Sequence, residues 1–246
     1  MRRFVAIAAA VAAVASAPVF ATPINGLYNT GVMNGEGKVD TNYAFAAVAG
    51  TFKGVTYGAG QATGTSYNGG TYGVAQSNDT NPAWMVTAPK SYWLAPTADT
   101  DQTYDPTTTG SYTWTANFNL AANTPIKMAD LTAQWASDNE GYVTLNGHTL
   151  ANSTINYGYP AFQKFYKFSA STSDFVAGTN SLVFHVFNVA PNSGDNPTGI
   201  NVQFLKSDIV AAPVPASALL FVSAMAGLVV FGRKRRQSGS LNSMAA

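Results

Sequence analysis

The stretch SYTWTANFNL, residues 111–120, alternates strictly between polar and apolar side chains. Its even-numbered positions are Tyr, Trp, Ala, Phe and Leu, and its odd-numbered positions are Ser, Thr or Asn. Alternation with a period of two is typical of a strand that buries one face and exposes the other. We therefore expect a long β-strand here, with its aromatic face in a hydrophobic core.

Related patterns follow further along the chain. Apolar side chains alternate again in residues 131–135 (LTAQW) and 199–205 (GINVQFL), and residues 181–189 are apolar on both faces, as in a central strand. The pair Asn146-Gly147 tolerates positive φ and predicts a type I′ hairpin turn. No segment between residues 22 and 210 carries a convincing apolar stripe of helical period. The pattern predicts an all-β fold, a single β-sandwich or jelly roll.

The composition agrees with one β-rich domain and argues against nucleic acid as a partner. Charged residues make up only 10% of the 246-residue chain, against about 25% in a typical soluble domain. Residues 22–210 hold seven lysines, no arginine and all twelve acidic residues, which gives a formal charge of −5. Clustered Lys and Arg bind phosphates, so this domain is a poor match for nucleic acid. The chain has no cysteine, which excludes disulfides and thiolate metal sites.

The N-terminus has the layout of a secretory signal peptide. Two arginines, Arg2 and Arg3, precede an apolar run over residues 4–14, and small residues follow. Cleavage is expected after Ala21, because the alternative cut after Ala17 would leave proline as the next residue. Residues 1–21 therefore predict export through the Sec machinery, and residues 22–210 form the exported domain.

The C-terminus combines a short motif, an apolar helix and a basic cluster. The motif is Pro213, Val214, Pro215, Ala216 and Ser217. Residues 216–232 are 17 apolar or small residues with two serines, at the lower limit of the ~17–25 that span a bilayer. The cluster that follows is Arg233, Lys234, Arg235 and Arg236, which would stay in the cytoplasm by the positive-inside rule. A plain membrane anchor would explain the helix and the cluster.

The whole arrangement resembles the bacterial PEP-CTERM sorting signal. Val214 stands where the family usually has Glu, whereas Ala216-Ser217 and Leu219-Leu220-Phe221 match its pattern. The resemblance implies an inner-membrane-anchored precursor that an exosortase cuts near residues 213–217. The mature domain would then be periplasmic, on the cell surface or extracellular, associated with exopolysaccharide or biofilm. Residues 237–246 extend past the usual basic stop, and we expect a disordered tail there.

A second resemblance concerns the β-rich domain. The stretches WASDN (135–139), VTLNG (143–147), FVAGTNSL (175–182) and NPTGI (196–200) resemble galactose-binding-like jelly-roll modules. The likeness covers most of residues 25–207 and implies a jelly-roll sandwich. It says little about the ligand, because many such modules bind no sugar.

Catalytic motifs are lacking in the sequence. Residues 64–68 (GTSYN) nearly form a nucleophile elbow, but the fifth position is Asn and the strand–turn–helix context is missing. Of the two histidines, we expect His185 to be a structural strand residue and His148 to lie in a solvated loop. We therefore expect a non-enzymatic surface or matrix protein. The alternative is a carbohydrate-binding module that recognises a specific glycan.

Glycan binding would need exposed aromatic faces beside polar groups. The candidates are Tyr157, Tyr159, Phe162 and Trp93, since aromatic rings can stack on pyranose rings. The competing interpretation is that these rings cap the open end of the sandwich core.

No cofactor is predicted, apart from a structural Ca²⁺ that oxygens of Asp138, Asn139 and Glu140 could hold. Turn chemistry explains this trio equally well. A second acidic stretch, Asp99 to Asp105, begins with EF-hand spacing but lacks the central Gly and the closing Glu. We expect a solvated loop there.

Overall fold

The computed structural model describes residues 21–33, 35–68, 84–99, 102–121, 126, 129–158, 161–191 and 194–210. All of them belong to one compact unit, Ala21–Val210. Residues 1–20 of the predicted signal peptide, and the sorting motif, the predicted helix 216–232, the basic cluster and the tail, lie outside the described residues. Within the described ranges, no helix has the length and hydropathy needed to cross a bilayer.

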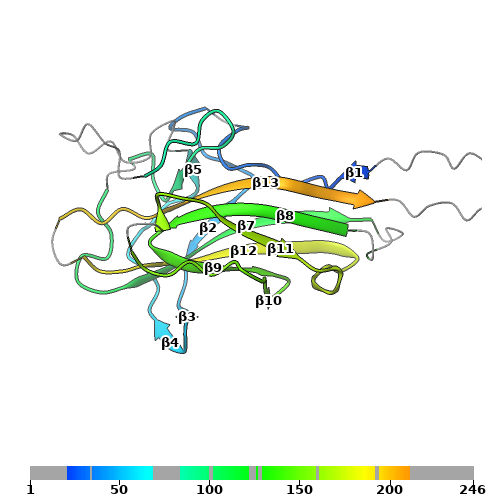
Figure 1. Ribbon diagram of the computed structural model, residues 1–246. Coiled ribbons are helices and arrows are strands. Elements are labelled where there is room, and N and C mark those ends of the chain that lie inside the picture. Colours follow the sequence, from blue (N-terminus) through cyan, green and yellow to red (C-terminus); the bar gives the residue numbers. More distant parts are fainter. Residues whose placement is uncertain are drawn as a thin grey trace, which may run out of the picture. The chain divides into compact units, whose positions relative to one another are not determined.

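Two antiparallel sheets form the body of the unit (Figure 1). The first sheet has the order β11-β8-β13-β6-β5, with β1 also paired to β13. Its strands are β1 (Ala21–Pro23), β5 (Tyr67–Asn68), β6 (Leu94–Ala95), β8 (Ala129–Asp138), β11 (Tyr166–Ala170) and β13 (Gly199–Val210). The second sheet has the order β10-β9-β12-β7-β2. Its strands are β2 (Ala44–Ala47), β7 (Gly110–Leu120), β9 (Glu140–Leu145), β10 (His148–Thr149) and β12 (Gly178–Asn188).

Two smaller elements complete the described structure. Strands β3 (Gly50–Phe52) and β4 (Val55–Tyr57) pair only with each other and project as a hairpin from the sandwich (Figure 1). A single turn of 3-10 helix, η3 (Thr172–Asp174), precedes β12. The prediction of an all-β sandwich is confirmed.

The strand predictions are confirmed as well. β7 buries Tyr112, Trp114 and the other even-numbered positions of 111–120, as the alternation predicted. β12 is a central strand, paired with β7 along its whole length from Gly178↔Leu120 to Asn188↔Gly110 and with β9 on its other side. On its outer face, Phe187 is covered by Phe52 of the β3–β4 hairpin at 5.2 Å between ring centroids, so apolar residues are buried on both faces of this central strand.

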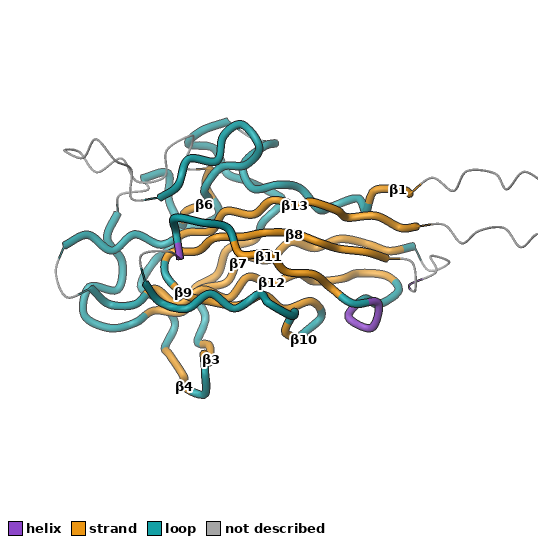
Figure 2. Tube along the Cα trace, in the orientation of Figure 1, coloured by secondary structure: helices purple, strands orange, loops and turns teal. Residues whose placement is uncertain are grey.

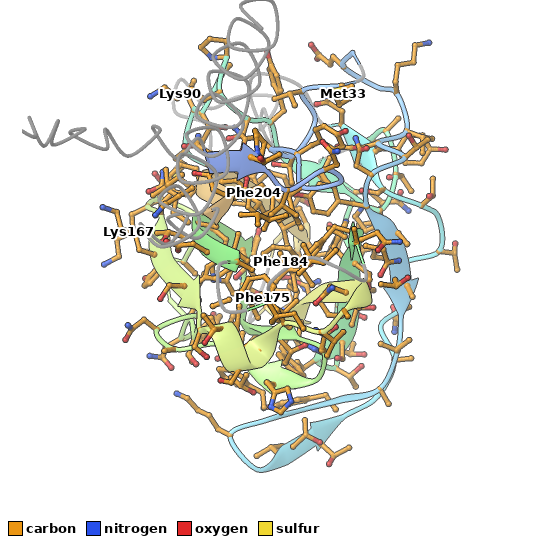
Figure 3. All side chains as sticks on the ribbon, turned by 90° about the vertical axis from the view of Figure 1, so that its right-hand side faces the viewer. Met33, Lys90, Lys167, Phe175, Phe184 and Phe204 are labelled. Atoms are coloured by element: carbon orange, nitrogen blue, oxygen red, sulfur yellow. The ribbon has the colours of Figure 1, made fainter. Side chains whose placement is uncertain are left out.

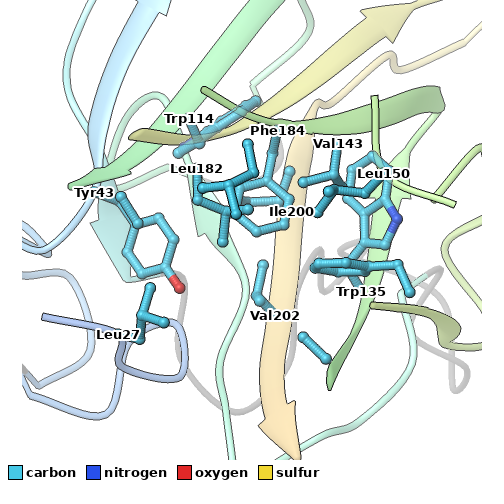
Figure 4. Close-up of a cluster of buried hydrophobic side chains, with 14 of the residues drawn as sticks. Leu27, Tyr43, Trp114, Trp135, Val143, Leu150, Leu182, Phe184, Ile200 and Val202 are labelled. Atoms are coloured by element: carbon cyan, nitrogen blue, oxygen red, sulfur yellow. The ribbon is translucent and has the colours of Figure 1, made fainter. Parts of the chain in front are cut away.

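The core lies between the two sheets. The second sheet contributes Trp114, Val143, Leu182 and Phe184, and the first sheet contributes Trp135, Ile200 and Val202, as Figure 4 shows. Phe184 packs at 5.6 Å from Trp135 and 6.1 Å from Phe168, measured between ring centroids. In Figure 3, Phe175 and Phe184 lie inside the sandwich, whereas Lys167 points outward. The largest fully buried side chains are mostly aromatic, which suits a domain without disulfides because each buried ring removes a large apolar area from water.

One residue connects the two sheets at a sharp corner. β8 of the first sheet ends at Asp138 and β9 of the second sheet begins at Glu140, so that Asn139 alone joins them. The backbone N–H of Val189 donates to the Asn139 Oδ1 atom at 2.8 Å, and the Thr198 hydroxyl donates to the Asp138 carbonyl at 2.8 Å. These bonds connect the corner to the segment between β12 and β13.

A further layer covers the outer face of the first sheet. Trp84 and Trp93 stack at 4.4 Å between centroids and pack on Ala136 of β8. Beside them, the Ser91 hydroxyl donates to Asn201 Oδ1 at 2.6 Å and accepts from the Gln203 amide at 2.8 Å. Hydrogen bonds to this layer therefore satisfy the buried polar side chains of Asn201 and Gln203 on β13.

The hairpin between β9 and β10 confirms the predicted type I′ turn. Asn146 and Gly147 have φ of 53° and 84°. The Asn146 side chain donates to Asp174 O and to Asn180 Oδ1, both at 2.8 Å, and accepts from Ser181 N at 3.0 Å. The turn residue therefore also fixes the start of β12.

Replacing Asn146 with alanine is expected to destabilise the domain by about 2–3 kcal/mol, because three hydrogen bonds are lost and the Ser181 N–H is left without its partner. Urea unfolding measures this change. Asn152→Ala is the matched control, because Asn152 also has a positive φ, 61°, but is exposed. Its expected cost is about 1 kcal/mol. Equal losses in the two variants would show that the turn conformation alone matters.

Candidate functional site

A pocket of about 380 Å³ opens beside the corner between β8 and β9. Its lining includes two carboxyl groups, two amides and two aromatic rings, and comprises Asp138, Asn139, Tyr157, Gly158, Phe162, Val189, Pro191, Asp195, Asn196 and Pro197. We call it the corner pocket. The structure thus brings together two sets of residues that the sequence analysis treated separately: the Asp138–Asn139 pair and the aromatic candidates Tyr157 and Phe162.

Three chain segments meet at the corner pocket. The corner itself supplies Asp138 and Asn139. The segment after β10 supplies Tyr157, Gly158 and Phe162, and the segment after β12 supplies Val189, Pro191, Asp195, Asn196 and Pro197. β8 and β12 both run toward this end of the sandwich, and β7 and β13 both start there. Figure 2 shows loops gathered at this end, away from β1. Loops held by a rigid strand framework are where binding sites commonly occur.

Asp138 is the buried polar anchor of the pocket, only 4% exposed. The indole N–H of Trp84 donates to its Oδ2 atom at 2.8 Å, and the Asn139 amide donates to its Oδ1 atom. Burial raises the pKa of Asp138 to about 7, against the opposing effect of the two hydrogen bonds. The carboxyl group therefore changes charge near neutral pH.

Tyr157 supplies the exposed ring, with 60% of its surface accessible. Its backbone N–H donates to Glu140 Oε2 at 3.1 Å. Just before it, Ile155 and Gly141 exchange two backbone hydrogen bonds of 3.0 and 2.8 Å. The main chain at Tyr157 is thus fixed against β9 while the ring faces solvent. Phe162 is half-buried and packs against both apolar clusters.

The structure contradicts the prediction that Trp93 stacks on a glycan. Trp93 is fully buried against Trp84, and its indole N–H donates to Met85 O at 3.0 Å. Its ring belongs to the layer over the first sheet and has no face open to a ligand. Tyr159 lies outside the described residues.

The three predicted calcium ligands make separate hydrogen bonds at the corner. Asp138 accepts from Trp84 and Asn139, Asn139 accepts from Val189, and Glu140 accepts from Tyr157. In the part of the chain that the structure describes, no group of three His, Cys, Asp or Glu side chains is placed to hold a metal ion. Turn chemistry, the alternative reading of the trio, accounts for each of these contacts.

The prediction that Asp105 lies in a solvated loop is wrong. Asp105 is 1% exposed and accepts from the Tyr112 hydroxyl at 2.6 Å and from the Gln61 N–H at 2.9 Å. The Asn188 amide also donates to it at 3.1 Å. Asp105 is therefore a structural side chain that connects the start of β7 to the end of β12.

His185 is a structural strand residue, as the sequence indicated. His148 is exposed as expected, but it lies on the short strand β10 and not in a loop. His185 lies on the outer face of the second sheet, stacked on Tyr142 at 4.5 Å between centroids, with Nε2 at 3.1 Å from the Thr144 hydroxyl oxygen. Burial lowers the pKa of His185 to about 4, so the ring is neutral at physiological pH.

Comparisons with known proteins add little. No protein-family model matches the chain, and no curated protein matches it. Among solved structures, the chain is similar to a selenomethionine-labelled β-glucosidase from Kluyveromyces marxianus, with a TM-score of 0.32 and 10% sequence identity. The match covers 76% of this chain and 20% of that enzyme, so the chain spans about a fifth of the enzyme's length. A likeness this distant carries no argument about fold or activity.

The raised pKa of Asp138 predicts a pH-dependent stability. Its protonated form is favoured in the folded state, so its contribution is present below about 4 and is lost as the pH rises through about 7. The lowered pKa of His185 acts in the opposite direction, with stability lost as the pH falls from 6.5 toward 4. The raised pKa of Glu140 has the same sign as Asp138.

Asp138→Asn separates these effects, because it removes only one titrating group. The stability of the parent protein relative to this variant is expected to fall between pH 4 and pH 7 and to level off above, as measured by chemical denaturation at each pH. A difference that stays constant over this interval would contradict the raised pKa.

Proposed function

We propose that this chain is an exported, non-enzymatic surface or matrix protein that an exosortase-type system delivers, and that its β-sandwich binds glycan through the corner pocket. The delivery part rests on one observation, the succession of Pro213–Ser217, the apolar residues 216–232 and the basic residues 233–236. The signal-peptide pattern of residues 1–21 supports the same route.

The finer description of the fold as a galactose-binding-like jelly roll is also a proposal. Successive long strands alternate between the sheets, since β7, β9 and β12 belong to the second sheet and β8, β11 and β13 to the first. Such alternation is expected of a jelly roll, in which the chain passes repeatedly between two facing sheets. The hairpin at Asn146-Gly147 lies where the resembling modules have their Leu-Asn-Gly turn.

Glycan binding rests on the composition of the corner pocket. The exposed Tyr157 ring offers an apolar face for a sugar ring, and the exposed Asp195 carboxylate and the half-buried Asn139 amide offer hydrogen-bonding groups for hydroxyls. Asp138 and Asn196 are buried in the wall, where their side chains bond to the protein itself. A concave site with apolar walls and a few convergent polar groups is the usual form of a small-molecule site. Its volume of about 380 Å³ lies at the lower end of the ~300–1,000 Å³ typical of such pockets.

The corner pocket is distant from both ends of the described unit. Those ends lie at one end of the sandwich, where Ala21 pairs with Val210. The corner pocket lies at the other end, where β8 finishes at Asp138 and β13 starts at Gly199.

Intact-mass spectrometry of the mature protein from its native host tests delivery. We expect an N-terminus at Thr22 and a C-terminus within residues 213–217, in agreement with the two predicted cuts. A mature protein that ends at Ala246 would refute sorting by an exosortase and leave a plain membrane anchor.

A glycan array tests the pocket. Tyr157→Ala is expected to lower the affinity for the bound glycan about five- to thirtyfold, since stacking on one aromatic ring contributes on the order of 1–2 kcal/mol. The melting temperature should stay unchanged, because the ring is exposed and the backbone bond to Glu140 is kept. Tyr28→Ala, at a 38% exposed tyrosine outside the pocket, is the control. Equal retention of glycan by both variants would argue against the corner pocket.

A further inference from the structure

A second hollow lies under the β3–β4 hairpin. This groove has a volume of about 310 Å³ and is lined by Thr51, Phe52 and Lys53 from the hairpin and by Tyr142, Thr149 and Thr154 from the second sheet and its edge. We call it the hairpin groove. Its walls carry four hydroxyl groups, an ammonium group and two aromatic rings, so that, like the corner pocket, it combines polar groups with aromatic faces.

The hairpin is held on the sheet by aromatic contacts. The Phe52 ring lies 6.2 Å from Tyr142 and nearly parallel to it, at 11° between planes. Phe52 also packs on Phe187 at 5.2 Å. At the tip, Lys53 and Gly54 have φ of 51° and 82°, the left-handed pair of a tight hairpin turn. The groove therefore has fixed walls, and the Lys53 side chain extends from a rigid turn.

One chain segment borders both hollows. After β10, the chain continues along the free edge of β9: Leu150 N–H donates to Val143 O, and Ile155 pairs with Gly141. Thr154 of this segment lines the hairpin groove, and Tyr157 lines the corner pocket. Three residues span roughly 10 Å at full extension, so the two hollows adjoin each other.

Glu140 lies at the junction between them. Its Oε2 atom accepts from Tyr157 N–H, and the positive charge of Lys53 acts on the same carboxyl group. Tyr142 follows two residues later on the same face of β9, because side chains alternate along a strand. A ligand that extends from Tyr157 past Glu140 toward Tyr142 would meet aromatic rings and polar groups along its whole path.

We propose that the corner pocket and the hairpin groove are adjoining subsites for one extended polysaccharide chain. This inference rests on the proposed glycan binding and specifies its ligand class as an internal stretch of a polymer. Each hollow alone has room for little more than one or two sugar rings. Occupation of both makes the second contact intramolecular, which raises the affinity for long chains over short ones.

The test measures affinity against chain length. The probes are soluble galactan, mannan, dextran and alginate, each as the polymer, the octasaccharide and the disaccharide. Binding is measured by isothermal titration calorimetry on the mature protein, with both chain ends as they are after processing. We expect the octasaccharide of the preferred polymer to bind at least about tenfold more tightly than the disaccharide.

Variants separate the two subsites. K53G combined with T154A should lower octasaccharide affinity about tenfold and leave disaccharide affinity unchanged. Glycine suits the positive φ at position 53, and Thr154 is exposed, so the fold is kept. Lys167→Ala removes an equal charge from the exposed side of β11 and is the control.

The outcomes distinguish the two proposals. The proposal of two adjoining subsites would be overturned if the parent protein bound octasaccharide and disaccharide equally, or if K53G/T154A had no effect on octasaccharide affinity. Either result would leave the proposed glycan binding at the corner pocket standing. Loss of disaccharide binding in K53G/T154A but not in Tyr157→Ala would place the site in the groove alone and also overturn the proposal of two subsites. Failure of the parent protein to bind any of the probes would remove both the proposed glycan function and this extension of it.

Discussion

The hydrogen bond from the Trp84 indole to the Asp138 carboxyl group connects three parts of the fold that are distant in sequence. Asp138 ends β8, where a single residue carries the chain from one sheet to the other, and Trp84 belongs to the layer over the outer face of the first sheet. A buried carboxyl group is costly unless it is hydrogen-bonded or protonated, so the surrounding side chains must keep this geometry. The corner, the tryptophan layer and the shape of the pocket beside them therefore depend on one another.

The two sheets form a rigid body, and the polar and aromatic groups of the two proposed subsites lie at one end and one edge of it. Long antiparallel strands such as β7 and β12 satisfy their backbone groups over their full length. Segments that leave this pairing are attached at a few points by side chains, as Asp105 attaches the start of β7 and Asn146 the start of β12. Tyr157 follows the same rule, with its main chain fixed and its ring free. Recognition by such a surface needs no domain movement, because the polar and aromatic groups are already in position.

Features that depend on local sequence were predictable, and those that depend on distant partners were not. Alternation in residues 111–120 reflects one buried face of one strand, so it predicted β7 directly, and Asn146-Gly147 predicted a turn from its own conformational preference. The burial of Trp93 results from Trp84 and Ala136, and that of Asp105 from Tyr112 and Gln61. No pattern near these residues reveals such partners. The corner pocket was predicted only in part: Asp138, Asn139, Tyr157 and Phe162 were singled out, but in two groups assigned to different chemistry, and the lining residues after β12 were not.

The pairing of β1 with β13 has a consequence for the order of assembly. Ala21, Thr22 and Pro23 emerge first from a ribosome or a translocon, yet they pair with Val210, Ile209 and Asp208, which emerge last of the described residues. β13 also lies between β8 and β6, so the first sheet cannot form its central pairings until β13 has been synthesised. Contacts of such long sequence separation form slowly. On the proposed export route, delayed folding would keep the polypeptide unfolded while it passes through the translocon, and the sandwich would close only after translocation.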